Sequence, residues 1–155
     1  MITSVRVLSQ TSQIVFGNNA PNVIVGLGGL QGAPGLPGQV GVSSYVASAN
    51  LSALRAVILT PTGLDYADAS LAGHADKVVG ITTQAGLAGA LILVRSEGEV
   101  EDSSWAWVAG EPVWLGFSGL LTQDLPVAPG LNACLGYAVT STKMYVQISD
   151  SIYLN

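Results

Sequence analysis

Short runs of alternating or β-branched apolar residues, separated by glycine, proline and polar turns, fill the chain beyond residue 42. The clearest run is KMYVQIS, in which Met144, Val146 and Ile148 fall on one face while Tyr145 and its alternate neighbours fall on the other. A period of two is typical of a strand with one buried face. The same pattern predicts strands in RAVILT (55–60), DKVVGITTQ (76–84), the two halves of GALILVRSEGEVED (89–102, meeting at Glu97–Gly98), the two halves of WAWVAGEPVWLG (105–116) and LNACLGYAV (131–139).

Many short strands with frequent turns predict an all-β domain over residues 42–155, built as a sandwich or a barrel. We expect Trp105, Trp107 and Met144 to be substantially buried in it. The segment PTGLDYADAS (61–70) is interpreted as a turn, and ANLSALRA (49–56) as the one place for a short helix.

Residues 1–25 are β-like but too short to enclose a core. SVRVLS alternates, SQIVF and NVIVG are β-branched runs, and GNNAPN between them is typical of a turn. We expect this arm to pair with other copies or with a larger partner.

A glycine at every third position separates the arm from the β-rich domain. The series is Gly26, Gly29, Gly32, Gly35, Gly38 and Gly41. At an average glycine usage of about 7%, six such matches have a chance probability on the order of 10⁻⁷. Only glycine fits at the axis of a collagen triple helix, and Pro34 and Pro37 stand where proline favours that conformation. The period predicts a collagen-like stalk over residues 26–41 and hence a homotrimer; a flexible glycine-rich linker is the alternative.

Charge and composition narrow the possible partners. The chain has 155 residues, of which 49% are apolar and only 10% charged, with five Lys and Arg and a net charge of −5. Nucleic-acid binding needs clustered basic residues, and a membrane-spanning helix needs roughly 20 apolar residues, so neither is expected. The N-terminus lacks the basic start and apolar core of a signal peptide, which predicts synthesis in a cytoplasm.

The ionisable residues converge on no recognised site, so no catalytic residue, metal or cofactor is expected. His74 is the only histidine, which leaves little for a zinc site. Ser118 in GFSGL misses the nucleophile-elbow pattern by one residue. Glu97, Glu99 and Glu101 alternate, which is typical of a solvated strand face, and Cys134 is interpreted as a plain buried residue.

Trp105, Trp107 and Trp114 form the one cluster in the sequence that resembles a binding site. Aromatic side chains are the usual content of cores and subunit interfaces, which is the first interpretation. The second is that exposed indoles stack on sugar rings of a host-surface glycan.

The arrangement of arm, collagen-like stretch and small domain resembles small virion proteins of tailed bacteriophages. Residues 50–150 are similar to phage capsid-decoration and head-fibre domains, through GITTQ, the GALILVRSEGEV segment, GEPVWLGFSGLLT and the final LGYAV. This resemblance implies a trimeric β-domain displayed on a virion, made in the bacterial host cytoplasm and without enzymatic activity.

Two functions follow as hypotheses. The first is a capsid decoration or head fibre anchored to a capsid protein through residues 1–25. The second is a tail fibre or baseplate appendage, anchored to a tail protein, whose β-domain binds host-surface carbohydrate.

Overall fold

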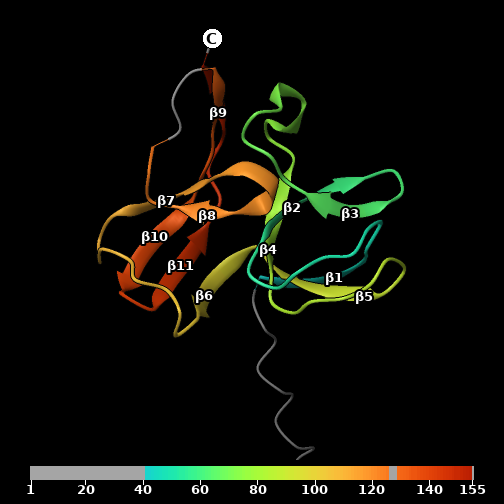
Figure 1. Cartoon of the computed structure of the whole chain (residues 1–155), viewed down its shortest axis with the longest axis horizontal. Coiled ribbons are helices and arrows are strands. Elements are labelled where there is room, and N and C mark those ends of the chain that lie inside the picture. Colours follow the sequence, from blue (N-terminus) through green and yellow to red (C-terminus); the bar gives the residue numbers. More distant parts are fainter. Residues whose placement is uncertain (1–40, 126–128, 155) are drawn as a thin grey trace, which may run out of the picture. The chain divides into compact units, whose positions relative to one another are not determined.

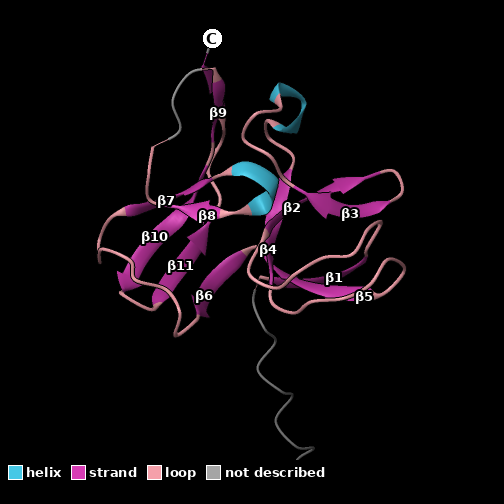
Figure 2. Cartoon of the chain, viewed as in Figure 1, coloured by secondary structure: helices cyan, strands magenta, loops and turns pink. Residues whose placement is uncertain are grey.

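Antiparallel strands dominate the part of the chain that the computed structural model describes, residues 41–125 and 129–154 (Figures 1 and 2). Its helical content consists of two single 3₁₀ turns, η1 (Ala72–His74) and η2 (Phe117–Gly119). The mostly β prediction for the C-terminal domain is therefore confirmed. The predicted arm, and the stalk glycines from Gly26 to Gly38, lie outside the described residues.

The first sheet has five strands in the order β1-β5-β4-β2-β3. These strands are β1 (Val42–Val46), β5 (Leu91–Arg95), β4 (Val78–Thr82), β2 (Ala56–Thr60) and β3 (Gly63–Tyr66). A single bridge between Ala47 and Leu64 joins the chain after β1 to β3. The sheet curls but does not close into a barrel.

The second sheet also has five strands, in the order β6-β11-β10-β7-β8. They are β6 (Glu97–Glu101), β11 (Lys143–Gln147), β10 (Cys134–Thr140), β7 (Pro112–Leu115) and β8 (Leu121–Thr122). A two-stranded ladder of β9 (Gly130–Asn132) and β12 (Ile152–Leu154) completes the fold.

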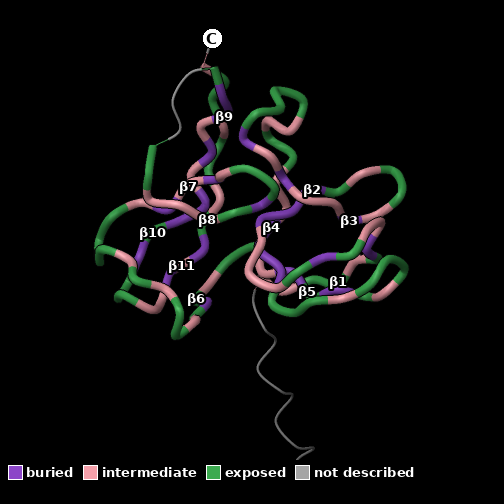
Figure 3. The backbone as a smooth tube through the Cα atoms, in the orientation of Figure 1, coloured by how far each residue is buried: buried purple, intermediate pink, exposed green. Residues whose placement is uncertain are grey.

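Two apolar cores hold these sheets, and Figure 3 shows their buried stretches along both sheets. In the larger core, Ala56, Ile58 and Ile81 of the first sheet pack with side chains of the second sheet. The second-sheet members include Val113, Leu115, Leu135, Met144 and Val146, all fully buried. The smaller core lies on the opposite face of the first sheet and contains Val57, Leu64, Ile92 and Val94 together with Ala47 and Leu51. One sheet thus has a buried face on each side.

Met144 is fully buried on β11, as its alternation predicts, and Trp105 and Trp107 are partly buried against the larger core. Two expectations about secondary structure were wrong. No helix forms over residues 49–56, and Gly63–Tyr66, interpreted as part of a turn, is strand β3 because it pairs with β2.

The strands β5 and β6 are both present, but they do not form a hairpin. They meet at Ser96 rather than at Glu97–Gly98, and they belong to different sheets. Residues 102–111, where one strand of a pair was expected, form a loop ahead of β7.

Gly41 is the one stalk glycine within the described residues, and its φ is +74°. Polyproline II requires a φ near −75°, so this residue does not have the triple-helical conformation. Its carbonyl oxygen instead accepts a hydrogen bond from the backbone N–H of Ser96 (2.7 Å). Gly41 therefore forms the turn that opens β1, and only Gly26 to Gly38 of the glycine series remain candidates for the predicted stalk.

No helix within residues 41–125 and 129–154 is both long and apolar enough to cross a membrane.

Candidate functional site

Asp68, His74 and Ser118 form the polar network closest to a catalytic constellation. Asp68 lies between β3 and η1, and its carboxylate accepts hydrogen bonds from the Ser70 hydroxyl (2.6 Å) and from the Ser118 backbone N–H (2.9 Å). The His74 Nδ1 atom accepts the backbone N–H of Asp68 (3.0 Å). Ser118 has a φ of +50°, and Arg55 reaches its carbonyl oxygen at 3.5 Å.

This network anchors a loop rather than arranging a nucleophile. A serine hydrolase needs the imidazole to accept the serine hydroxyl while the carboxylate orients the imidazole. Here the Asp68 carboxylate accepts hydrogen bonds from Ser70 and Ser118 rather than from the imidazole. The His74 Nδ1 atom accepts a hydrogen bond from the backbone N–H of Asp68. Burial raises the pKa of Asp68, but the hydrogen bonds from Ser70 and Ser118, with the nearby His74, outweigh it and leave the pKa below its usual value. The carboxylate form therefore ties the β3–η1 loop to η2.

A second carboxylate, that of Asp76, lines a groove of about 510 Å³ between β4 of the first sheet and the segment after β11. The Asp76 carboxylate accepts hydrogen bonds from the backbone N–H and the hydroxyl of Ser151, both at 2.9 Å. The Ser151 hydroxyl oxygen in turn accepts the backbone N–H of Asp76 (2.7 Å). These bonds lower the pKa of Asp76. Glu97 and Asp150 also line the groove, which therefore favours cations over anions.

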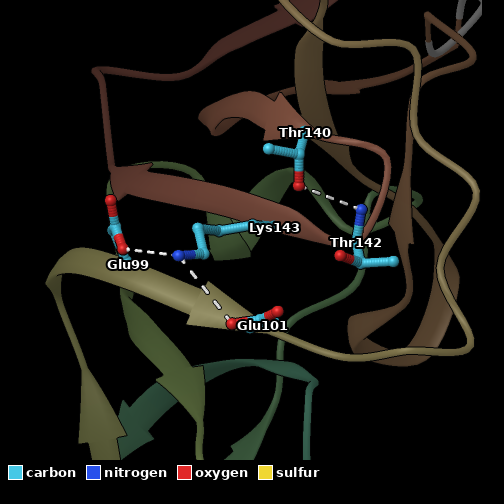
Figure 4. Close-up of polar contacts among 5 residues, drawn as sticks. All are labelled: Glu99, Glu101, Thr140, Thr142 and Lys143. Atoms are coloured by element: carbon cyan, nitrogen blue, oxygen red, sulfur yellow. Dashed lines mark hydrogen bonds and ion pairs between the residues drawn. The ribbon is translucent and has the colours of Figure 1, made fainter.

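The predicted acidic face on β6 is confirmed, and it has one basic partner (Figure 4). Glu97, Glu99 and Glu101 are all exposed. Lys143 on the neighbouring β11 lies 3.1 Å from Glu99 and 3.8 Å from Glu101, which raises the pKa of its ammonium group. Among the residues that the structure describes, no group of three or more His, Cys, Asp or Glu side chains is placed to hold a metal ion.

The structure brings two of the three candidate tryptophans together. The rings of Trp105 and Trp107 lie 5.4 Å apart at an angle of 50°. They stand in the loop between β6 and β7, where the backbone N–H of Trp107 bonds to Ser141. The Trp107 indole N–H is buried and has no hydrogen-bond partner among the described residues. Trp114 alternates with buried Val113 and Leu115, so it belongs to the opposite, outer face of the second sheet.

That outer face carries aromatic residues that the sequence interpretation missed. Tyr137 and Tyr145 are directly opposed on β10 and β11, and their rings stack at 5.7 Å. Alternation along each strand was a usable signal, because both tyrosines flank buried residues. Cys134, expected to be buried, is half-buried and is paired with Trp114 in the ladder.

A second groove, of about 440 Å³, is mainly apolar and lies beside η2 and β8. Phe117, Leu120 and Leu125 line it and are exposed to 66%, 48% and 57%. The described domain therefore presents aromatic and aliphatic surfaces.

No model of a known protein family matches this chain, and neither does any curated protein in a search at the usual threshold.

Proposed function

We propose that this chain is a non-enzymatic structural protein of a tailed-bacteriophage particle, a homotrimeric capsid decoration or head fibre. Residues 1–25 anchor it to a capsid protein, a short collagen-like stalk follows, and the β-domain faces outward. The resemblance of residues 50–150 to phage decoration and head-fibre domains supports a location on a virion. The glycine period from Gly26 to Gly38 carries the proposal, because it has a specific physical reason only in a three-chain rod.

The surface of the described domain supports an assembly role. Large apolar side chains are exposed across it, including Leu87, Leu91, Phe117 and Ile152, each at 63–70%. A chain with only 10% charged residues relies on contacts with copies or partners to cover such surface. The described domain is built mainly from antiparallel strands, a fold suited to display.

The proposed anchoring mechanism is strand addition. An extended arm gains affinity by pairing its backbone with an exposed sheet edge of the capsid protein. SVRVLS and SQIVF suit this because each has β-branched residues and at most one charge. Three arms on one stalk bind more tightly than one by raising the effective concentration, provided the capsid presents matching sites around a three-fold position.

Localisation on the particle tests this proposal. A label fused to the C-terminus is expected on the head in cryo-microscopy of virions, and a truncated chain that begins at Gly26 is expected to trimerise but not to bind virions. A label on the tail contradicts the decoration role. Virion binding by the truncated chain that equals that of the full chain contradicts the anchor.

The second candidate function is a tail fibre or baseplate appendage that binds host-surface carbohydrate. It is favoured by the Trp105–Trp107 pair and by the aromatic outer face that carries Trp114 and the stacked tyrosines. The test is binding of the full chain to host-surface glycans, with Trp105→Ala and Trp114→Ala as variants. Loss of binding in one variant alone identifies which of the two faces contacts the sugar, and no binding by the full chain contradicts this function.

A further inference from the structure

An apolar strip lies on the outer face of strands β1 and β5. The register pairs Val46 with Leu91 and Ser44 with Leu93. Leu91 and Leu93 alternate with fully buried Ile92 and Val94, so they face away from the smaller core. Val46, Leu91 and Leu93 are exposed to 48%, 63% and 40%. We call these three residues the β1–β5 strip.

This strip continues a sheet face that is buried elsewhere. Arg95, two residues after Leu93, pairs with Ile81 on β4, and Ile81 pairs with Ala56 on β2. Ile81 and Ala56 are both fully buried in the larger core. The second sheet thus covers this face over β2 and β4 and leaves it bare over β5 and β1. Ser44 and Arg95 share this face with the strip. Exposed apolar side chains that lie together on one face mark interaction surfaces.

The strip also lies on an edge strand. Within the described residues the strand ladder of β1 pairs with β5 alone, but the end of β1 lies against β3, where Ala47 bridges Leu64. Only the part of the second edge before Val46 is therefore without a strand partner among the described residues. Unprotected edges are a template for pairing with another chain, and proteins commonly protect them with charge, proline or a covering element. The sequence of β1, VSSYV, has neither charge nor proline.

The proposed stalk brings the β1 strands of three copies of the chain close together, so a second copy is the partner nearest to this strip. Three residues separate Gly38 from Val42, so four Cα-to-Cα steps limit the distance from Gly38 to the start of β1 to about 14 Å. In the proposed triple helix every Gly38 lies at the common axis. The β1 strands of three copies therefore begin within about 14 Å of one three-fold axis, a distance comparable to the radius of a domain of this size.

We infer that the β1–β5 strip is the surface through which three copies of the β-domain meet around the stalk axis. The inference rests on the proposed homotrimer and assigns its interface. Each strip contacts a neighbouring copy, and the ring closes at three. The β-domain contacts then hold together a stalk whose few triplets are too short to associate alone.

Charge placed in the strip provides the first test. We would make Leu91→Glu and Leu93→Glu in the full chain, with Val108→Glu as the matched control, because Val108 is 63% exposed in the loop before β7. The mass in solution is measured by size exclusion with light scattering over a range of concentrations, and near-ultraviolet circular dichroism reports the fold. We expect a trimer for the wild type and for Val108→Glu, and a monomer for both strip variants.

Radical footprinting of the wild type provides a second test that needs no variant. Leu87 and Leu91 are the same residue type and are exposed to 70% and 63% in the single chain, so they should be oxidised at similar rates in a monomer. The strip interface predicts that Leu91 is protected several-fold relative to Leu87.

The outcomes separate the two proposals. A monomeric wild type contradicts the homotrimer and with it the proposed function. A trimeric wild type in which Leu91 and Leu87 are oxidised equally, or in which folded Leu93→Glu stays trimeric at every concentration, overturns the strip interface and leaves the trimer standing.

Discussion

Replacing Gly119 by alanine tests how closely the two sheets are joined. Gly119 lies in η2 with a φ of +72°, and its backbone N–H donates to the carbonyl oxygen of Ala67. A β-carbon at this position would lie 2.5 Å from the carbonyl oxygen of Ala56 on β2 and 3.0 Å from the Tyr66 ring. The absence of a side chain is thus what lets the β7–β8 connection lie against the first sheet.

Two contributions lower the free energy of unfolding of Gly119→Ala. Left-handed backbone costs an alanine about 1–2 kcal/mol relative to glycine. Forcing a methyl group against a backbone carbonyl that cannot rotate away adds about 1–3 kcal/mol, as in overpacked cores. We therefore expect Gly119→Ala to lower the free energy of unfolding by about 2–5 kcal/mol.

Gly110→Ala is the matched control. Gly110 has a similar φ of +85°, but a β-carbon there would meet nothing within 4 Å. This variant should lose only the backbone cost of about 1–2 kcal/mol. The free energies of unfolding of the two variants are measured by urea unfolding followed by tryptophan fluorescence. One protein concentration is used throughout, because the stability of an oligomer depends on the protein concentration. Equal losses in the two variants would refute the close approach of η2 to β2.

Three further predictions concern the core, the pH dependence and the stalk. Met144→Ala removes a fully buried side chain and should cost about 2–5 kcal/mol in urea unfolding, whereas Val108→Ala, at an exposed position, should cost almost nothing. Because the pKa of Asp68 in the folded chain lies below its ordinary value of 3.8, its stabilising effect is complete above that pH and is lost as the pH falls through the lower value. As the pH is lowered, the urea midpoint of Asp68→Asn should therefore fall less than that of the wild type. Midpoints that fall in parallel with pH in the two proteins would contradict this. Gly32→Val should lower the melting temperature of the trimer, and Ala33→Val, whose position in the triplet faces outward, should not; equal melting temperatures would favour a flexible linker.

Local alternation predicted the strands whose two faces differ. β11 is the clearest case, because Met144 and Val146 are buried while Tyr145 and Gln147 are not. β2 and β4 were also predicted within a residue or two, since β-branched runs between turn residues are typical of buried strands. In these strands the residues that the sequence pattern predicts to be buried are the ones that pack in the core.

Pairing between distant residues could not be predicted in this way. The GLDY segment has glycine and aspartate, which favour turns, yet it becomes β3 because Leu64 is buried opposite Leu59 on β2. The pattern of β5 and β6 shows two strands but not that they enter different sheets at Ser96. Likewise, the Asp76–Ser151 contact joins residues 75 apart, and neither residue type signals the other.

The tryptophan cluster shows how spacing alone misleads. The order W-A-W imitates a strand, and it placed Trp105 and Trp107 correctly beside each other. The segment nevertheless forms a loop, because its backbone bonds to the β10–β11 turn at Ser141 rather than to a strand of its own. Trp114 is on a true strand whose buried neighbours place it on the outer face, where Tyr137 and Tyr145 are the aromatic residues to consider with it.

Gly41 shows that one glycine can satisfy two different requirements. In the sequence it continues the period of three, and by that criterion it belongs to the stalk. In the structure a β-carbon at Gly41 would lie 2.6 Å from the carbonyl oxygen of Glu97, and its φ of +74° opens the turn into β1. Glycine is therefore required there by the β-domain alone, whether or not a triple helix precedes it. The five glycines from Gly26 to Gly38 therefore support the stalk without Gly41. The turn at Gly41 directs the chain into β1 three residues after Gly38, the last of these glycines.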